Sequence, residues 1–98
     1  MAAYIVAHVK ITDPETYERY RARTPDVVAA YGGRFVIRGS EPEVLEGAWA
    51  VQRLVVIEFP DKAAARRFYE SPEYQEIVDL RRQASEGTLA IFEGGPQS

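Results

Sequence analysis

Apolar and polar residues alternate over residues 4–11, which predicts a first β-strand whose side chains point to two opposite faces in turn. The residues on one of these faces are Ile5, Ala7, Val9 and Ile11. Residues 34–38 and 88–93 are predicted to form two further strands. Residues 53–59 are mostly apolar and rich in β-branched side chains, so we expect a buried strand there.

A three- and four-residue spacing of apolar side chains predicts a helix after the first strand. Its start can form in two ways: Asp13 caps the helix with Pro14 in the first position, or Thr12 and Glu15 form a capping box. The apolar stripe consists of Tyr17, Tyr20, Thr24, Val27, Val28 and Tyr31. Pro25 is expected to kink this helix, and the pair of glycines after the stripe to end it.

A second helical region follows the buried strand. Asp61 stands where an N-cap belongs, directly ahead of a run of alanines that favour a helix. Pro72 interrupts this region, and Ser71 is expected to cap a new helix that begins at Pro72. The new helix continues through Tyr74, Ile77, Val78 and Arg81. We expect it to end at Gly87.

The connection between the second and third strands is long for a hairpin. Gly39 is expected to break or bulge the second strand. We expect residues 43–46 to extend the ladder and residues 47–50 to make the turn, with Trp49 at its tip.

The element order is β-α-β-β-α-β, and right-handed crossovers then place the helices together on one face of a four-stranded antiparallel sheet. We therefore expect an α+β fold of the ferredoxin-like type. It forms a single domain over residues 1–98, with a core of about residues 4–94 and a frayed tail at residues 95–98.

The other face of this sheet is expected to be bare, yet it is too apolar for an ordinary solvated surface. Its residues are Tyr4, Val6, His8, Val36, Arg38, Leu54, Val56 and Glu58. A second copy of the chain is the simplest cover. The pattern thus predicts a homodimer in which two sheets pack face to face as a dimeric α/β barrel.

Charge and composition narrow the possible functions. The net charge is −3 with interspersed signs, so no basic stripe indicates a nucleic-acid partner. The chain has no cysteine, which excludes disulfides and thiolate sites and fits a reducing compartment. Its first ten residues predict neither a signal peptide nor a membrane span. We therefore expect a cytoplasmic protein with no nucleic-acid or membrane partner.

Several segments resemble those of a known family. They are YIVAHVKITDPETYERY, AAYGGRFVIRG, EVLEG, RLVVIEFPD, SPEYQ and ASEG. Together they resemble the uncharacterised bacterial family called domain of unknown function 1330, over about residues 4–94. This family is a branch of the dimeric α/β-barrel superfamily, so the resemblance implies a ferredoxin-like subunit and dimerisation. Other branches include cofactor-free monooxygenases, lactone isomerases and haem enzymes, and the resemblance implies no particular reaction.

The candidate catalytic residues are His8 and Glu58. His8 is the single histidine and could serve as general acid or base near neutral pH, although one histidine on a half-buried strand is often a packing residue. Glu58 interrupts an apolar strand and needs a partner there, for which Arg38 is the candidate. If the register agrees, these three residues form a polar cluster in an apolar cavity. Alternatively, they form a structural ion pair at the dimer interface or at the edge of the sheet.

Aromatic residues complete the candidate site. Arg38 and Tyr4 are proposed to bind the substrate, and Trp49, Tyr69 and Tyr74 to line the mouth of the pocket. For Tyr69 and Tyr74, the competing interpretation is packing in the core. For Trp49, the alternatives are a lid, a dimer contact or packing. We predict no metal site, because only Glu58 and tyrosines accompany His8, whereas catalytic zinc normally has three protein ligands. We also predict no cofactor.

Two classes of function remain open. The first is a homodimer that binds a small organic molecule, an anion among the candidates, in a cavity near the dimer interface. Such a protein could also be a cofactor-independent enzyme with His8 as acid or base. The second is a non-catalytic dimerisation or structural module, in which the polar residues fix the subunit register. A haem enzyme is a more distant third class, since His8 is poorly placed for an axial ligand.

Overall fold

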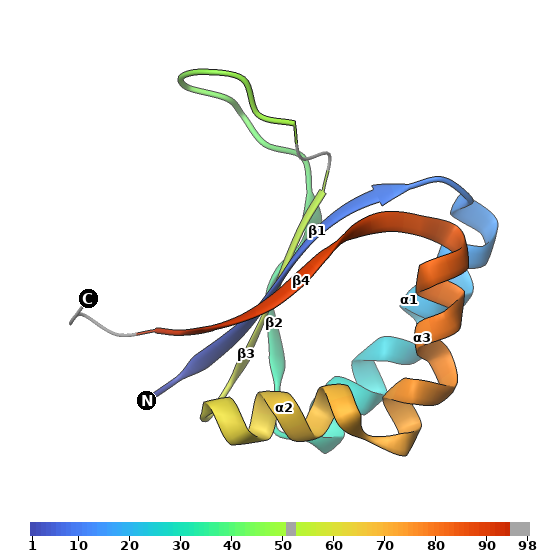
Figure 1. Ribbon diagram of the computed structural model, residues 1–98, viewed down its shortest axis with the longest axis vertical. Coiled ribbons are helices and arrows are strands. Elements are labelled where there is room, and N and C mark those ends of the chain that lie inside the picture. Colours follow the sequence, from blue (N-terminus) through green and yellow to red (C-terminus); the bar gives the residue numbers. More distant parts are fainter. Residues whose placement is uncertain (51–52, 95–98) are drawn as a thin grey trace.

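The computed structural model describes residues 1–50 and 53–94. Its elements in chain order are β1 (Ala3–Ile11), α1 (Pro14–Ala30), β2 (Arg34–Ser40), β3 (Arg53–Phe59), α2 (Lys62–Glu70), α3 (Pro72–Ala84) and β4 (Ser85–Glu93). The four strands form one antiparallel sheet in the order β2-β3-β1-β4. The three helices lie on one face of this sheet and leave the other face open (Figure 1). The predicted α+β, ferredoxin-like fold is confirmed.

The hydrophobic core lies between the sheet and the helices. Alternate residues of β1 that face the helices are buried, and the last residue of β3, Phe59, is 1% exposed. Phe59 packs against Phe68 of α2, and Phe68 packs against Tyr74 of α3, with ring centroids 5.2 and 4.7 Å apart. Burial of these large side chains fixes how the helices sit on the sheet.

Three side chains start the helices as the sequence predicts. Asp13 caps α1, because its carboxylate accepts from the backbone N–H of Thr16 at 3.2 Å. Asp61 caps α2 by accepting from Ala64 N–H at 2.7 Å, and Ser71 Oγ caps α3. Of the two possible starts of α1, the structure thus has the one with Asp13 as N-cap and Pro14 next to it.

The predicted end of α3 is wrong. This helix ends at Ala84, and Gly87 lies inside β4, level with Val9 of β1. A Cβ atom at Gly87 would collide with the carbonyl oxygen of His8. Gly87 therefore allows β4 to lie close to β1, and it does not end a helix.

The predicted ladder over residues 43–46 is also wrong, since residues 41–50 contain no strand. They form an arm that projects from the end of β2, beyond the sheet and on the side away from the helices (Figure 1). Gly47 turns the arm with a φ of +75°, a value that glycine adopts without steric cost. The predicted tail at residues 95–98 lies outside the described residues.

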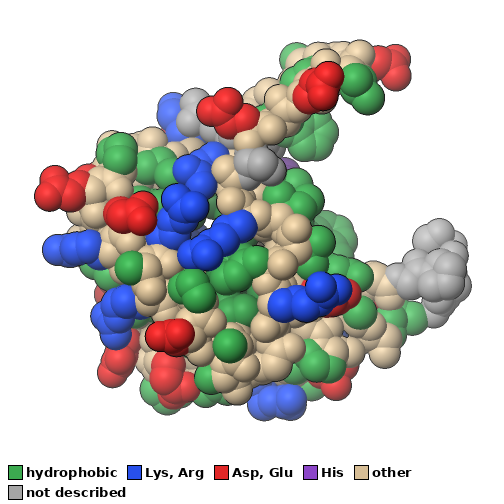
Figure 2. Space-filling view, turned by 180° about the vertical axis from the view of Figure 1, so that it is seen from behind, with side chains coloured by type: hydrophobic (Ala, Val, Ile, Leu, Met, Phe, Trp, Pro, Cys, Tyr) green, Lys and Arg blue, Asp and Glu red, His purple; other side chains and the backbone are tan. Residues whose placement is uncertain are grey.

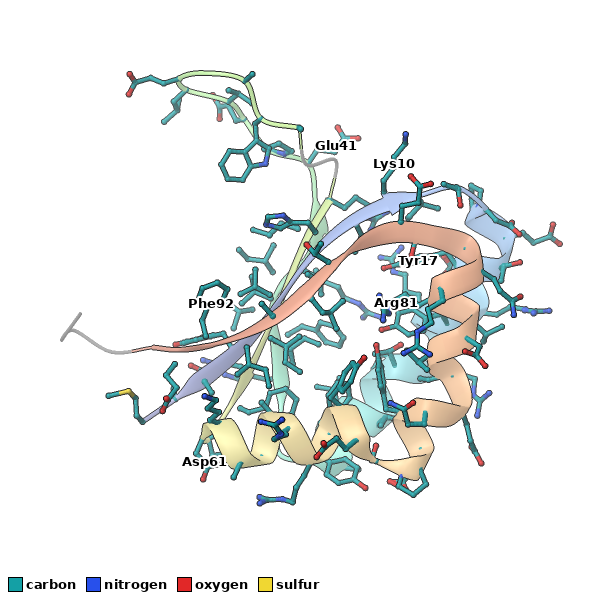
Figure 3. The ribbon with its side chains drawn as sticks, viewed as in Figure 1. Lys10, Tyr17, Glu41, Asp61, Arg81 and Phe92 are labelled. Atoms are coloured by element: carbon teal, nitrogen blue, oxygen red, sulfur yellow. The ribbon has the colours of Figure 1, made fainter. Side chains whose placement is uncertain are left out.

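The open face of the sheet is apolar at its centre, as predicted. Residues paired across the strands share a face, so Val6, Val56 and Ala90 lie side by side on it. Val36 and Phe92 are 49% and 58% exposed. Figure 3 shows Phe92 on the side of β4 that points away from the helices. No helix among the described residues is long and apolar enough to cross a membrane.

Candidate functional site

The predicted cluster of His8, Glu58 and Arg38 does not form, because β2 contains two irregularities. The register shifts between Phe35 and Ile37 and again between Arg38 and Ser40. An extra residue in a strand reverses the faces of those that follow. Arg38 therefore lies level with Val55, on the face that is covered by helices, rather than on the open face.

His8 and Glu58 do share the open face, but they lie apart. Glu58 is level with Tyr4, whereas His8 is level with Leu54. This offset of four residues corresponds to roughly 13 Å along the strand. His8 is exposed beside Thr88 of β4, close to Ala50 at the base of the arm.

Glu58 finds another partner on the open face. Arg34 Nε donates to its carboxylate at 2.6 Å, and the Tyr4 hydroxyl donates to it at 3.0 Å. These two hydrogen bonds lower the pKa of Glu58, with Arg34 as the larger cause. The same carboxylate raises the pKa of Tyr4. This trio links β1, β2 and β3 and has the geometry of the structural alternative considered for Glu58.

The predicted aromatic residues are divided between three places. Tyr74 is 1% exposed and faces the interior between the helices and the sheet. Tyr69 packs against Tyr74, with ring centroids 5.6 Å apart. Trp49 lies on the projecting arm and is 54% exposed. The five aromatic and basic residues of the predicted binding set thus do not converge on one pocket.

A different cavity lies between the sheet and the helices, and every strand and helix contributes to it. Its lining residues are Ile5, Ala7, Val9, Tyr17, Tyr20, Arg21, Thr24, Phe35, Arg38, Gly39, Arg53, Val55, Ile57, Phe68, Tyr74, Arg81 and Leu89. Its enclosed volume is ≈ 40 Å³, and the space widens to ≈ 580 Å³ where it opens to solvent. Since one water needs roughly 10–15 Å³, the enclosed part holds only a few waters, and a larger molecule would also occupy the open mouth.

Four arginines from four elements line this cavity: Arg21 of α1, Arg38 of β2, Arg53 of β3 and Arg81 of α3. The Nε atoms of Arg53 and Arg81 are buried and have no hydrogen-bond acceptor among the described residues. Figure 3 shows Arg81 and Tyr17 in the space between the sheet and the helices. Figure 2 shows basic side chains gathered where the helical side meets the sheet.

Two of these arginines are held in place by their surroundings. Arg38 Nη2 donates to the carbonyl oxygen of Arg21 at 3.1 Å, and its Cζ lies 4.6 Å from the centroid of the Phe35 ring. The guanidinium of Arg53 lies against Gly39, which has a φ of +73°. The irregularity at Gly39 thus positions Arg53, whereas the shift after Phe35 places Arg38 on the helical side of the sheet.

Three tyrosines form the wall opposite the sheet. The hydroxyls of Tyr20 and Tyr74 lie 2.9 Å apart and share a hydrogen bond. Burial raises the pKa of Tyr20, and the neighbouring Tyr74 adds to this effect. Burial also raises the pKa of Tyr17, whereas Arg53 and Arg81 act in the opposite direction. Tyr17 and Tyr20 therefore remain neutral donors at physiological pH.

The lining determines which chemistry this cavity can support. It contains arginines and tyrosines but none of the residue types that act as bases near pH 7, namely histidine, aspartate, glutamate and lysine. Guanidinium groups hold anionic oxygen atoms and stabilise negative charge that develops on a substrate. Among the described residues, no group of three or more histidines or carboxylates could hold a metal ion.

Sequence reasoning missed Arg53 and Arg81, although each left a signal. Arg53 precedes Val55 and Ile57 at a spacing of two, so it belongs to the face of β3 that is buried. Arg81 follows Ile77 and Val78 at helical spacing on the buried stripe of α3. A charged residue at a core position is expensive unless it is paired, which marks it as a candidate for binding.

Comparisons with solved structures confirm the fold. A protein of unknown function from Rhodopseudomonas palustris is 21% identical and superposes with a TM-score of 0.75, covering 95% of this chain and 82% of that one. A dimeric ferredoxin-like protein of unknown function from Jannaschia sp. CCS1 is 11% identical, with a TM-score of 0.75 and coverage of 96% and 100%. SnoaB, a cofactor-independent oxygenase from Streptomyces nogalater, is 20% identical, with a TM-score of 0.70 and coverage of 98% and 95%.

No curated protein matches the chain. A family described as "Domain of unknown function (DUF1330)" matches residues 2–95, nearly the whole sequence. This match agrees with the resemblance carried by the segments around DP, YGG, EFP and SPEY. The protein therefore belongs to the DUF1330 family.

Proposed function

We propose that this protein is a homodimer that binds a small organic molecule in the cavity between its sheet and its helices. The cavity itself carries the proposal, because it combines apolar and aromatic walls with a few polar groups that converge from different elements. Sites for small molecules have this composition. A core without a ligand function would be filled by apolar side chains instead.

The proposed dimer uses the open face of the sheet. Val6, Val56 and Ala90 form an apolar strip there, flanked by the more exposed Val36 and Phe92. A monomer rarely exposes such a face, and a second copy would cover it. The protein from Jannaschia sp. CCS1, which has the same fold and is dimeric, supports a dimer.

An acid or base role for His8 remains a separate hypothesis. His8 lies on the open face, whereas the cavity lies on the helical face of the same sheet. A reaction that used both would require the substrate to pass through the sheet. The likeness to a cofactor-independent oxygenase concerns the fold alone, and the cavity supports binding without supplying a base.

The competing function is a non-catalytic dimerisation module. The hydrogen-bonded trio of Arg34, Glu58 and Tyr4 favours it, since these residues join three strands on the face proposed for dimer contact. The two functions differ in where a small molecule would act. The first places it on the helical side of the sheet, and the second requires none.

Methyl-labelled NMR spectra separate these two functions. We would titrate the full-length protein with a library of several hundred small aromatic and aliphatic compounds. Binding in the cavity should shift the methyl signals of Ile57 and Leu89, while those of Leu54 and Val56 on the open face serve as internal controls. Shifts confined to the open face, or no shift from any compound at millimolar concentration, would exclude the cavity as a binding site.

A further inference from the structure

We infer that the cavity recognises the carboxylate of a small aromatic acid, which is held by Arg53 and Arg81 with help from Arg38. This inference rests on the proposed binding function and adds the chemical class of the ligand. The buried, unpartnered Nε atoms of Arg53 and Arg81 carry the inference. They come from β3 and α3, two elements that face each other across the cavity.

Three of the four arginines in this cavity have no ion-pair partner among the described residues. Arg21 forms an ion pair with Glu18 at 3.8 Å. No ion pair between described residues involves Arg38, Arg53 or Arg81. Several guanidinium groups around an apolar space repel one another and lose part of their hydration. An anion bound between them offsets both costs.

The donor geometry favours a flat group with two oxygens. A guanidinium presents its N–H groups as a rigid fork, which matches a carboxylate with two parallel hydrogen bonds. Arg38 is already positioned, since it donates to the Arg21 carbonyl and stacks over Phe35. It therefore adds charge close to the bound group without reorganising.

The walls of the cavity decide between an organic and an inorganic anion. Tyr17, Phe35, Phe68 and Tyr74 present aromatic surface to the same space. Inorganic phosphate would leave this surface without a partner, whereas the ring of an aromatic acid would cover it. The enclosed part is too narrow for a whole ring, so the ring of the ligand would lie partly in the open mouth of the cavity.

Benzoate is the probe that tests this inference, and benzamide is its neutral isostere. We expect benzoate at millimolar concentration to raise the melting temperature and to shift the Ile57 and Leu89 methyl signals, and benzamide to bind at least tenfold more weakly. Equal binding of the two compounds in the cavity would overturn the carboxylate inference and leave the proposed function intact.

Two neighbouring arginines of α3 provide a matched pair of variants. Arg81 lines the cavity, whereas Arg82 is exposed and lies 3.4 Å from Asp79. Arg81→Gln should weaken benzoate binding about tenfold or more, because a hydrogen bond to a charged group is lost, whereas Arg82→Gln should change it less than twofold. Equal effects of the two variants would overturn the inference.

Two further measurements keep the test decisive if Arg81→Gln does not fold. Arg53→Gln removes the other unpartnered donor and should also abolish the preference for benzoate over benzamide. Inorganic phosphate should not displace benzoate at equal concentration. Full displacement of benzoate by phosphate would overturn the inference of an aromatic acid and indicate that the cavity binds phosphate. A failure of benzoate to bind, while other compounds shift the cavity signals, would overturn only the carboxylate inference.

Discussion

The backbone carbonyl oxygen of Arg21 in α1 accepts a hydrogen bond from Arg38 of β2, at 3.1 Å from Nη2. In a regular helix this carbonyl would accept from the residue four positions later, which here is Pro25 and has no N–H. The proline thus leaves an acceptor that faces the sheet, and Arg38 uses it. A feature that weakens the helix thereby fixes a charged side chain in the cavity.

This relationship predicts that Pro25→Ala stabilises the protein. The substitution restores the helical donor for the Arg21 carbonyl and replaces the least favourable helix residue by the most favourable one, so the free energy of unfolding should rise by about 1–3 kcal/mol. Urea denaturation measures this change. Asp26→Ala at the exposed neighbouring position is the control and should change stability by less than about 0.5 kcal/mol. A loss of stability in Pro25→Ala would show that the proline relieves strain elsewhere in α1.

A second prediction concerns the start of α2. Asp61 accepts from the Ala64 N–H at 2.7 Å, so Asp61→Ala should lower the free energy of unfolding by about 1 kcal/mol. Asp61→Asn retains an acceptor and should lose much less. The urea denaturation midpoints of the parent protein, Asp61→Ala and Asp61→Asn measure these differences in stability. An unchanged midpoint in Asp61→Ala would mean that water replaces the cap at no cost.

The elements of the fold could be predicted because their signals are local. A carboxylate or hydroxyl ahead of a helix, as at Asp13 and Ser71, satisfies backbone donors within the next three residues. Alternation over β1 depends only on which face is buried. The end of α3 could not be predicted from Gly87, because the glycine responds to the carbonyl of His8 on another strand.

The candidate site could be predicted only in part, because it depends on the faces of β2. Counting by twos places Arg38 beside Val36 on the open face, but the register shift after Phe35 moves it to the helical side. No glycine marks this first shift, whereas Gly39 marks the second. Two of the predicted site residues, Tyr74 and Arg38, do line the cavity. Tyr74 lies there because it belongs to the apolar stripe of α3, whereas Arg38 reaches it only through the register shift.

A third prediction tests the proposed dimer. Val56 lies at the centre of the open face, so Val56→Asp should give a monomer or an aggregate, because an unpaired charge in an apolar interface is costly. Ala63→Asp places the same charge at an exposed position of α2 and should leave the dimer intact. Sedimentation at micromolar concentration should show twice the chain mass for the parent protein and the control. A folded monomer in the parent protein would exclude the barrel arrangement.

A fourth prediction concerns the trio on the open face. The hydrogen bonds from Arg34 and Tyr4 lower the pKa of Glu58, so their contribution to stability is present above the ordinary value of 4.5 and is lost as the pH falls through the folded-state value. Glu58→Gln should therefore reduce the loss of stability below pH 4.5. The same variant should lower the pKa of Tyr4 toward its ordinary value, since the carboxylate raises it.

Denaturation at several acidic pH values and a tyrosine ¹³C NMR titration measure these two effects. Arg34→Gln is a second arm, because it removes the larger cause of the Glu58 shift while leaving the Tyr4 hydroxyl in place. Arg34→Gln should also reduce the loss of unfolding free energy at acidic pH. Identical acid profiles for the parent protein and both variants would mean that the trio contributes nothing to folding.

The last prediction joins the backbone of β2 to the proposed site. Gly39 has a φ of +73°, and a Cβ atom there would lie 2.7 Å from Arg53 Nε and 2.8 Å from its Cζ. Gly39→Ala should thus cost about 1–2 kcal/mol in backbone strain and also displace the Arg53 guanidinium.

Gly47 has nearly the same φ, +75°, but nothing lies near its missing Cβ. Gly47→Ala therefore carries the strain without the collision. If the two variants lose similar stability but only Gly39→Ala loses the preference for benzoate over benzamide, then the position of Arg53 selects the ligand. Equal preference in both variants would separate the irregularity at Gly39 from binding.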